Sequence, residues 1–387
     1  MSDSLLILNN EAFVLNSNNA AHKKKSRTAY EIMHMEKVVA AISSTGQAQI
    51  YDPVFMPYDL YLERESAEND IDTMVNNLDN FYHWCASRVL SLDRKYAKEI
   101  LNSIGVAQAV TDRDRAAISL SYHCVSLTDV FWVRREGERV NFSQLNLYDN
   151  PLNEAVVELS LKGKPLTVTN HELAPDLSTK GCFPKAWIRD QNGFKLLKDG
   201  GEKEVKKELL ASEICQCFDI PQVTYRPFHF EGQIVTQSSI ITSKEYSIVS
   251  KMAFDIYACN HDLNTVDFCK KLDPVTYYGM NLLDYLTGNI DRHPENWGFL
   301  VDNRTNLCIS LYPVMDFNQC FLAYDTLEGA NCQTVLPQNM TQREAAVDAV
   351  KHIGLRQIQE MDYSQFGDME KEAQMFRRRL SELAKIS

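Results

Sequence analysis

The sequence predicts an α+β protein of two lobes, a small β-rich lobe and a larger helical lobe, behind an N-terminal α/β accessory domain. Its 387 residues suffice for two domains, or for one with an added module. Alternating apolar residues indicate strands in the middle of the chain, and apolar residues at helical intervals mark its last third. We therefore expect a tail or loop at 1–28, an accessory domain at 29–140, a small lobe at 141–243 and a large lobe at 244–387.

The N-terminal region begins with a short apolar run at 5–8, expected to be a strand or a disordered start. The Asn-rich residues 9–20 indicate a loop or tail. Residues 31–51 predict short strands that are broken at Gly46.

Helices are expected in the rest of the accessory domain. Residues 70–90 carry apolar side chains along one face, and Tyr82 and Trp84 of this segment are expected in the core rather than at an interface. Asp93 is expected to cap a second helix that stops at Gly105, and a third helix should cover 112–127.

The middle of the chain reads as a strand, a helix and a hairpin. Residues 194–198 alternate and end at Lys198. Residues 202–218 have one apolar face and predict a helix with Glu208 toward its middle. A hairpin between residues 223 and 240 follows.

The C-terminal part begins with a helix at 275–288, which Gly288 is expected to end. A polar loop at 289–295 follows. Two strands, at 296–301 and 307–311, are joined by a turn-rich connector.

Two further helices are expected near the end of the chain. Thr341 and Glu344 have the spacing of a capping box, which predicts a helix that ends at Gly354. The final helix is expected at 363–385, with the basic residues 377–379 on its solvated surface.

The most informative pattern is an Asp and an Asn separated by four residues, Asp291 and Asn296, followed by Asp316 beyond the second strand. A protein-kinase catalytic loop places its base and one Mg²⁺ ligand with this spacing, and an Asp-Phe pair supplies the second metal carboxylate. The alternative is a polar loop with a capping Asn and an unrelated turn Asp. The preceding helix and the intervening hairpin favour the kinase-type site, with Asp291 as base and Asn296 and Asp316 as metal ligands.

The upstream half of such a site needs a cation for the phosphates. Lys198 could reach the phosphates of ATP, and Glu208 could hold it there. A solvated lysine and a surface glutamate are the alternatives. Gln237, Ser238 and Ser239 would lie at the adenine hinge, where contacts are made mostly by the backbone.

From about residue 131 to residue 325, the chain resembles the HipA-like kinase family, the toxin component of bacterial HipA–HipB-type systems. The specific part runs from Gly288 to Asn296, which is similar to the family pattern Asn-x-Asp-Arg-His-x-x-Asn; weaker support comes from residues 187–188, 194–198, 204–214 and 316–318. The resemblance implies a protein-kinase-like fold, ATP and Mg²⁺ as cofactors, and transfer to Ser or Thr of a protein substrate. It implies catalytic roles for Lys198, Asp291 and Asn296.

The resemblance also implies a phosphate-covering loop at 177–181. Ser178, Thr179 and Gly181 would then contact the nucleotide, and Ser178 or Thr179 would be a candidate for autophosphorylation. A plain Ser/Thr/Gly turn is the alternative. In the family the N-terminal domain packs on the kinase and can meet an antitoxin, so a helix-turn-helix partner and a role as toxin or growth regulator are expected.

The chain departs from better-known kinases in three respects, and the first is that it has no Gly-x-Gly-x-x-Gly loop. Asn318 replaces the Gly of the Asp-Phe-Gly motif, and Arg292 and His293 follow the catalytic Asp instead of preceding it. This order also resembles phosphatidylinositol 3/4-kinases, distant relatives of the family. A small-molecule or lipid-headgroup kinase and a pseudokinase binding module therefore remain as alternatives.

Composition limits the partners. The net charge of −12 disfavours direct non-specific binding to nucleic acid. No apolar run approaches the roughly 18 residues of a membrane span. The ten scattered cysteines lack zinc spacing and predict reduced, buried thiols in a cytoplasmic protein.

Overall fold

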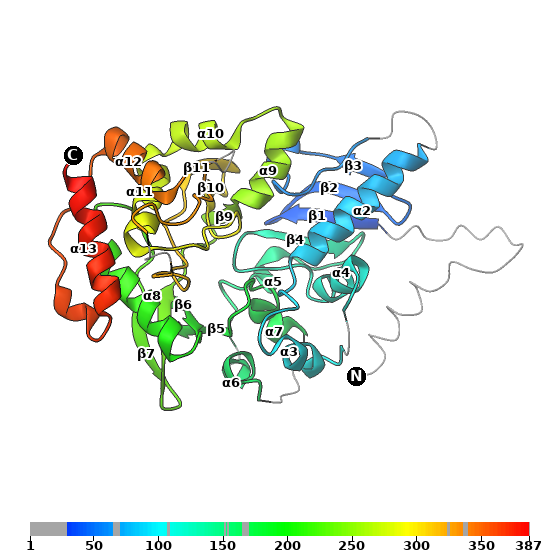
Figure 1. Ribbon diagram of the computed structural model, residues 1–387. Helices are drawn as coiled ribbons and strands as arrows, with labels where there is room; N and C mark the ends of the chain where they lie inside the picture. Colours follow the sequence, from blue (N-terminus) through cyan, green and yellow to red (C-terminus); the bar gives the residue numbers. More distant parts are fainter. Residues whose placement is uncertain are drawn as a thin grey trace, which may run out of the picture.

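The computed structural model describes residues 29–64, 70–106, 109–150, 152, 155–164, 170–322, 326–335 and 340–386. The tail expected at 1–28, with its possible strand at 5–8, lies outside them. Within these ranges, antiparallel sheets and surrounding helices form a mixed α+β structure, as predicted (Figure 1). Figure 1 places the first sheet and α2 (Ile71–Ser87) at one end of the molecule and α11 (Pro274–Thr287), α12 (Gln342–Ile353) and α13 (Glu370–Ala384) at the other.

The first sheet has the strand order β3-β2-β1-β4 and contains β1 (Ala29–His34), β2 (Lys37–Ser43), β3 (Ala48–Ile50) and β4 (Phe131–Arg135). The strands expected at 31–51 are confirmed, and β4 joins them from far along the chain. Helix α2 (Ile71–Ser87) covers one face, beginning where Asp70 accepts a hydrogen bond from the Thr73 N–H. Trp84 is buried in the core, as expected.

Two expectations for the next helices are wrong. Helix α3 (Ala97–Ser103) starts after Tyr96, which has a left-handed φ of +69° and no capping side chain, so Asp93 does not cap it. Helix α4 (Asp112–Ser121) ends before residue 127, because the left-handed residues His123 and Cys124 cannot continue a right-handed helix. The remaining N-terminal elements are η1 (Pro53–Phe55), α5 (Phe142–Leu145), α6 (Ala155–Lys162) and α7 (Asn170–Leu177).

The second sheet has the order β5-β6-β8-β7 and contains β5 (Lys185–Asp190), β6 (Gly193–Lys198), β7 (Arg226–Phe230) and β8 (Gln233–Ser239). The strand and the hairpin expected here are confirmed. Helix α8 (Glu202–Cys215) follows β6 and ends three residues before the expected end at 218.

The third sheet has the order β11-β10-β9 and contains β9 (Tyr246–Ser250), β10 (Gly298–Asp302) and β11 (Leu307–Leu311). Its neighbouring helices are α9 (Lys251–Asn260), α10 (Thr265–Leu272), α11 (Pro274–Thr287), α12 (Gln342–Ile353) and α13 (Glu370–Ala384). The capping box of α12 is present. The expected final helix is interrupted, because Gly367 at φ +53° separates η2 (Tyr363–Phe366) from α13.

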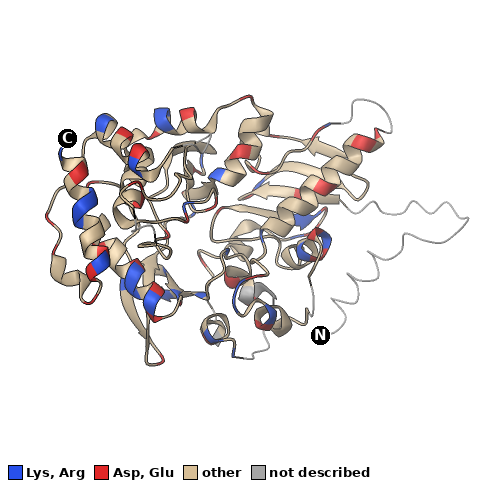
Figure 2. Ribbon diagram, viewed as in Figure 1, with Lys and Arg blue, Asp and Glu red and all other residues tan. Residues whose placement is uncertain are grey.

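Charged side chains of both signs are interspersed on the outer helices α8 and α13 (Figure 2). One basic residue of α13 departs from the expected solvated surface: Arg379 is buried, and its guanidinium donates to the carbonyls of Tyr285 and Thr326. It therefore ties the last helix to the end of α11.

Two hydrophobic clusters hold the parts together. The larger one joins α8, α11, α12, α13 and the third sheet. A second cluster crosses the expected boundary at residue 140, because Trp132 and Leu90 share it with Leu159, Leu177 and Phe194. The accessory region and the segment that leads to the second sheet therefore share one core.

The cysteines are all free of disulfides, and eight of the ten are at least partly buried, with Cys182 and Cys259 exposed. Among the described residues, no helix is both long and apolar enough to cross a membrane.

Candidate functional site

A cavity of about 430 Å³ lies where the second sheet, the third sheet and the accessory region meet. It collects residues that are far apart in the sequence. The predicted site residues on its wall are Ser178, Thr179, Gly181, Lys198, Ser238, Asp291, Asn296 and Asp316.

Lys198 lies at the end of β6 and forms the charged centre of this cavity. Its ammonium is 2.8 Å from Glu208 Oε1 and 2.7 Å from Asp316 Oδ1. Glu208 projects from α8, and its other oxygen accepts a hydrogen bond of 2.7 Å from the Thr236 hydroxyl. Burial alone would lower the pKa of Lys198, but the carboxylates of Asp316 and Glu208 outweigh it and raise the pKa above its usual range. The lysine is therefore held as a cation.

The loop after α11 carries Asp291 and Asn296. Gly288 ends the helix at φ +61°, as expected, and turns the chain into the cavity. The Asn296 amide donates to the Asp291 carbonyl at 2.9 Å, which leaves its amide oxygen available to a ligand. The Asp291 carboxylate is 41% exposed and lies 4.0 Å from His293 Nε2. Partial burial raises the pKa of Asp291, while His293 opposes the rise.

Arg292 braces the same loop from inside the protein. Its side chain is 3% exposed, and it makes a two-pronged ion pair with Asp284 of α11 at 2.9 and 3.0 Å. It also donates to the carbonyls of Asn296 and Met315, so one guanidinium joins α11, the loop and the segment before Asp316.

Asp316 has a left-handed φ of +61°, which is uncommon for a residue other than glycine and is often found at functional sites. Its N–H donates to the Tyr225 hydroxyl at 3.0 Å. Burial would raise the pKa of Asp316, but Lys198 and Lys185 outweigh burial and lower it, so the carboxylate is ionised.

Three side chains on the cavity wall could offer oxygens to a magnesium ion, Asn296, Asp316 and Asn318. Asn318 Oδ1 is buried on the cavity wall without a hydrogen-bond partner, and Asn296 and Asp316 each keep an oxygen that the protein does not use fully. The described residues contain no group of three or more His, Cys, Asp and Glu side chains that could form a metal cage. Mg²⁺ beside substrate phosphates needs no such cage, since one or two carboxylates suffice.

The expected phosphate-covering loop lies at the end of α7. Ser178 is 5% exposed and donates to the Pro175 carbonyl at 3.3 Å. Thr179 donates to the same carbonyl and accepts a 2.8 Å hydrogen bond from the Trp187 indole. The loop residues reach the cavity, but both hydroxyls are already engaged by the protein.

Lys185 is a site residue that the sequence reading missed. It lies on the cavity wall, directly opposite Lys198 in the β5–β6 hairpin, and its ammonium donates to the Lys180 carbonyl at 2.9 Å. Burial lowers the pKa of Lys185 to about 8, with Lys198 contributing and Asp316 opposing. Only the pairing of β5 with β6, which sets Lys185 opposite Lys198, would have identified this residue. The alternation of apolar residues within one strand does not reveal that pairing.

Two predicted residues are not on the cavity wall: Glu208, which reaches the site only through its ion pair with Lys198, and Gln237. Gln237 pairs with Leu197 in the sheet and is not part of the wall, whereas the chain from Ser238 to Thr242 is. The segment that lines the cavity therefore begins at Ser238, one residue after the first residue predicted for the hinge.

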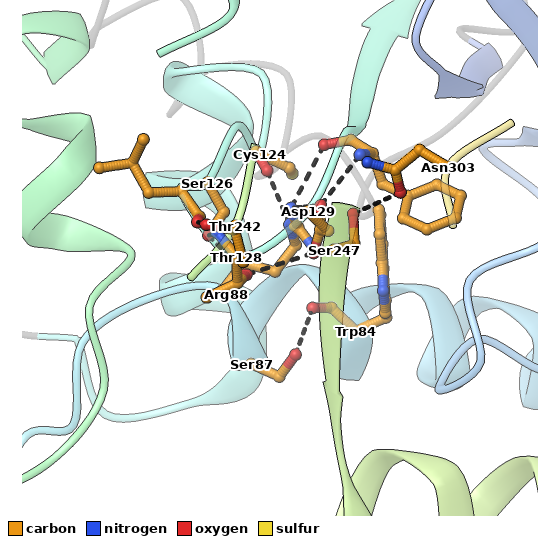
Figure 3. A network of polar contacts seen from close by, with 12 residues as sticks. Trp84, Ser87, Arg88, Cys124, Ser126, Thr128, Asp129, Thr242, Ser247 and Asn303 are labelled. Atoms are coloured by element: carbon orange, nitrogen blue, oxygen red, sulfur yellow. Dashed lines mark hydrogen bonds and ion pairs between the residues drawn. The ribbon is translucent and has the colours of Figure 1, made fainter. Parts of the chain in front are cut away.

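The accessory region closes the cavity on the side of this segment. Arg88, at the end of α2, makes a two-pronged ion pair with Asp129 at 2.7 and 2.8 Å, and the loop that carries Asp129 contacts the second half of the chain (Figure 3). Thr242 donates to the Leu127 carbonyl, and the Ile248 N–H donates to the Thr128 carbonyl at 2.9 Å. This wall too could not be predicted from motif spacing.

Comparisons with known proteins agree with this architecture at the level of the fold. No family model and no curated protein matches the sequence. Among solved structures, HipA from the toxin–antitoxin complex of Shewanella oneidensis MR-1 with HipB and operator DNA has a TM-score of 0.51 and 11% identity, covering 92% of this chain and 91% of that one. The proinflammatory kinase CtkA of Helicobacter pylori has a TM-score of 0.38 and 15% identity over 52% of this chain and 90% of its own, too low to support an argument. The resemblance inferred from the residues is thus confirmed for the fold: over most of its length, this chain has the fold of HipA.

Proposed function

We propose that this chain is an ATP- and Mg²⁺-dependent phosphotransferase of the HipA-like type that phosphorylates Ser or Thr of a protein. One observation carries the proposal. Lys198 is fixed between Glu208 and Asp316 in a cavity that Asp291 and Asn296 also line. A lysine–glutamate pair and a metal aspartate, both in place, are what phosphoryl transfer from ATP requires of a kinase.

Each side chain has a defined part in this mechanism. Lys198, with Lys185 beside it, would neutralise charge on the phosphates. Asp291, the most exposed carboxylate of the set, would accept or orient the proton of the substrate hydroxyl. Asn296, Asp316 and Asn318 would hold Mg²⁺. When bound, the ion supplies charge neutralisation on the transferred phosphoryl group.

The proposed architecture is the two-lobed one, with a small lobe at 141–243, a large lobe at 244–387 and the accessory domain at 29–140. The shared core across residue 140 supports an accessory domain that is fixed to the small lobe. HipA in the Shewanella complex is found with HipB and operator DNA. By analogy with that complex, we propose a cytoplasmic toxin or growth regulator whose partner is an antitoxin-like helix-turn-helix protein.

The test is incubation of the purified chain with γ-labelled ATP and Mg²⁺, beside Asp291→Ala, followed by mapping of the phosphorylated sites. Label on the wild type alone, on Ser178, Thr179 or an added protein, is the expected result. Because Ser178 is buried, its labelling would require the end of α7 to release the Pro175 carbonyl. Equal labelling by the Asp291→Ala variant would refute the assigned base.

Two other outcomes would replace the proposal. Label transferred only to a small hydroxylated metabolite or a lipid headgroup would make the chain a kinase of that class. ATP binding without any transfer would make it a pseudokinase binding module.

A further inference from the structure

The accessory region supports the phosphate-covering loop directly. The segment between α2 and α3, residues 88–96, runs beside residues 176–185. The Leu90 N–H donates to the Leu177 carbonyl at 2.5 Å, and the Lys95 N–H donates to the Cys182 carbonyl at 3.0 Å. These two main-chain hydrogen bonds therefore connect both ends of the phosphate-covering loop to the accessory region.

Arg94 lies between these two hydrogen bonds. Its side chain is 2% exposed, and its guanidinium donates to the carbonyls of Asp176 at 3.1 Å, Thr179 at 3.3 Å and Lys185. These three carbonyls come before, within and after the loop. A planar guanidinium with five donors can bridge them, whereas a lysine ammonium acts as a single point charge.

The energetics of Arg94 indicate a positional role. It makes no ion pair among the described residues, and its Nε has no hydrogen-bond partner. Burial lowers the pKa of Arg94, and the nearby carboxyl group of Asp176, which forms no ion pair with it, opposes this only in part. Because the hydrogen bonds of this buried cation all end on the loop and the residues that flank it, Arg94 orders that segment more than it stabilises the core.

We propose that Arg94 is a positioning residue that holds the loop 177–181 closed over the nucleotide cavity, and so couples the accessory domain to nucleotide binding. The second half of this statement rests on the proposed kinase function, whereas the first half does not. Arg94 is absent from the cavity wall, so it would act through the loop and not by touching the nucleotide.

The test uses the full-length chain and the variants Arg94→Gln and Arg94→Lys. Limited trypsin digestion, followed by mass spectrometry, reports cleavage after Lys180, whose side chain is already 50% exposed. We expect cleavage to be about tenfold faster in Arg94→Gln, since losing a charge-assisted hydrogen bond shifts an opening equilibrium by roughly that factor. Arg94→Lys keeps the charge, so its rate of cleavage should lie between those of the wild type and Arg94→Gln.

Arg134→Gln is the matched control. Arg134 belongs to the same region, donates to Glu31 and to the Val140 carbonyl, and does not line the cavity. This variant should leave cleavage after Lys180 unchanged. In Arg94→Gln, the KM for ATP should rise about tenfold at nearly unchanged kcat, because the loop contributes to binding.

The possible outcomes distinguish failure of the proposed role of Arg94 from failure of the proposed kinase function. Cleavage after Lys180 as slow in both Arg94 variants as in the wild type would overturn the proposal. Faster cleavage with an unchanged KM or Kd for ATP would overturn the coupling to nucleotide binding. Faster cleavage that ATP with Mg²⁺ suppresses would support the proposal even if no phosphoryl transfer were detected.

Discussion

Lys198→Ala tests the charged centre of the cavity. The substitution removes the cation between Glu208, which is 2% exposed, and Asp316. Removing one partner of a buried ion pair costs about 3–5 kcal/mol, because the remaining charge is left without compensation. We expect the free energy of unfolding at pH 7.5 to fall by about that amount, and phosphoryl transfer to be lost.

The loss in the free energy of unfolding should be smaller at low pH than at high pH. Without the lysine, the main cause that lowers the pKa of Asp316 is lost while burial, which raises it, remains, so the pKa of Asp316 in the folded state rises. A raised folded pKa means that the stability is present at low pH and is lost as the pH rises through that pKa. The difference from the wild type should therefore be smaller at pH 5.5 than at pH 7.5, by at most about 1.4 kcal/mol per pH unit and titrating group.

The assay is urea unfolding followed by tryptophan fluorescence at both pH values. Lys206→Ala is the control, because Lys206 forms an exposed ion pair with Glu202 on α8, and losing such a pair should barely change the free energy of unfolding. A Lys198→Ala loss no larger than that of the control would refute the reasoning. So would a loss that grows as the pH falls.

Three further predictions concern the metal ligand and the loop. Asp316→Asn should lower the rate of phosphoryl transfer at least about a hundredfold while ATP still binds, because the proposed metal carboxylate is lost. Unchanged transfer in the labelling assay would exclude Asp316 as a metal ligand. Burial raises the pKa of Asp176 from 3.8 to about 7, so its contribution to stability is lost as the pH rises through 7. Asp176→Asn should therefore be more stable than the wild type at pH 8, by about 1–4 kcal/mol in urea unfolding, but not at pH 4. Gly181→Ala should raise the KM for ATP, because Gly181 has a φ of +99° and an added Cβ would lie 2.3 Å from Lys185 Nζ and displace it. An unchanged KM, measured by initial rates, would contradict this close approach of Gly181 to Lys185.

Local patterns were sufficient where a residue's neighbours in sequence determine its place. Gly288 ends α11 because it adopts a left-handed φ, and the polar loop that follows brings Asp291 and Asn296 into the cavity. The alternation of β6 likewise placed Lys198 at the end of a strand. These features depend on about ten consecutive residues each, so one sequence contains the necessary signal.

Features that depend on tertiary packing were not predictable in the same way. Arg94 and Lys185 are ordinary basic residues until the fold places one against three carbonyls and the other beside Lys198. Arg379 belongs to a basic run that looks solvated, yet it is buried against α11. In each case the partner lies at least thirteen residues away or in another element, where periodicity carries no information.

The buried Arg292–Asp284 pair has a consequence for control of the molecule. In many protein kinases, arginine orders the activation loop only after a phosphate has been added to that loop. Here Arg292 is already paired with a carboxylate of the chain itself, and the Lys198–Glu208 pair is already formed. The charged side chains of the candidate site are therefore in place as soon as the molecule has folded. Under the proposed function, a cell would then control the activity through the number of copies made and their lifetime rather than through ordering of the loop.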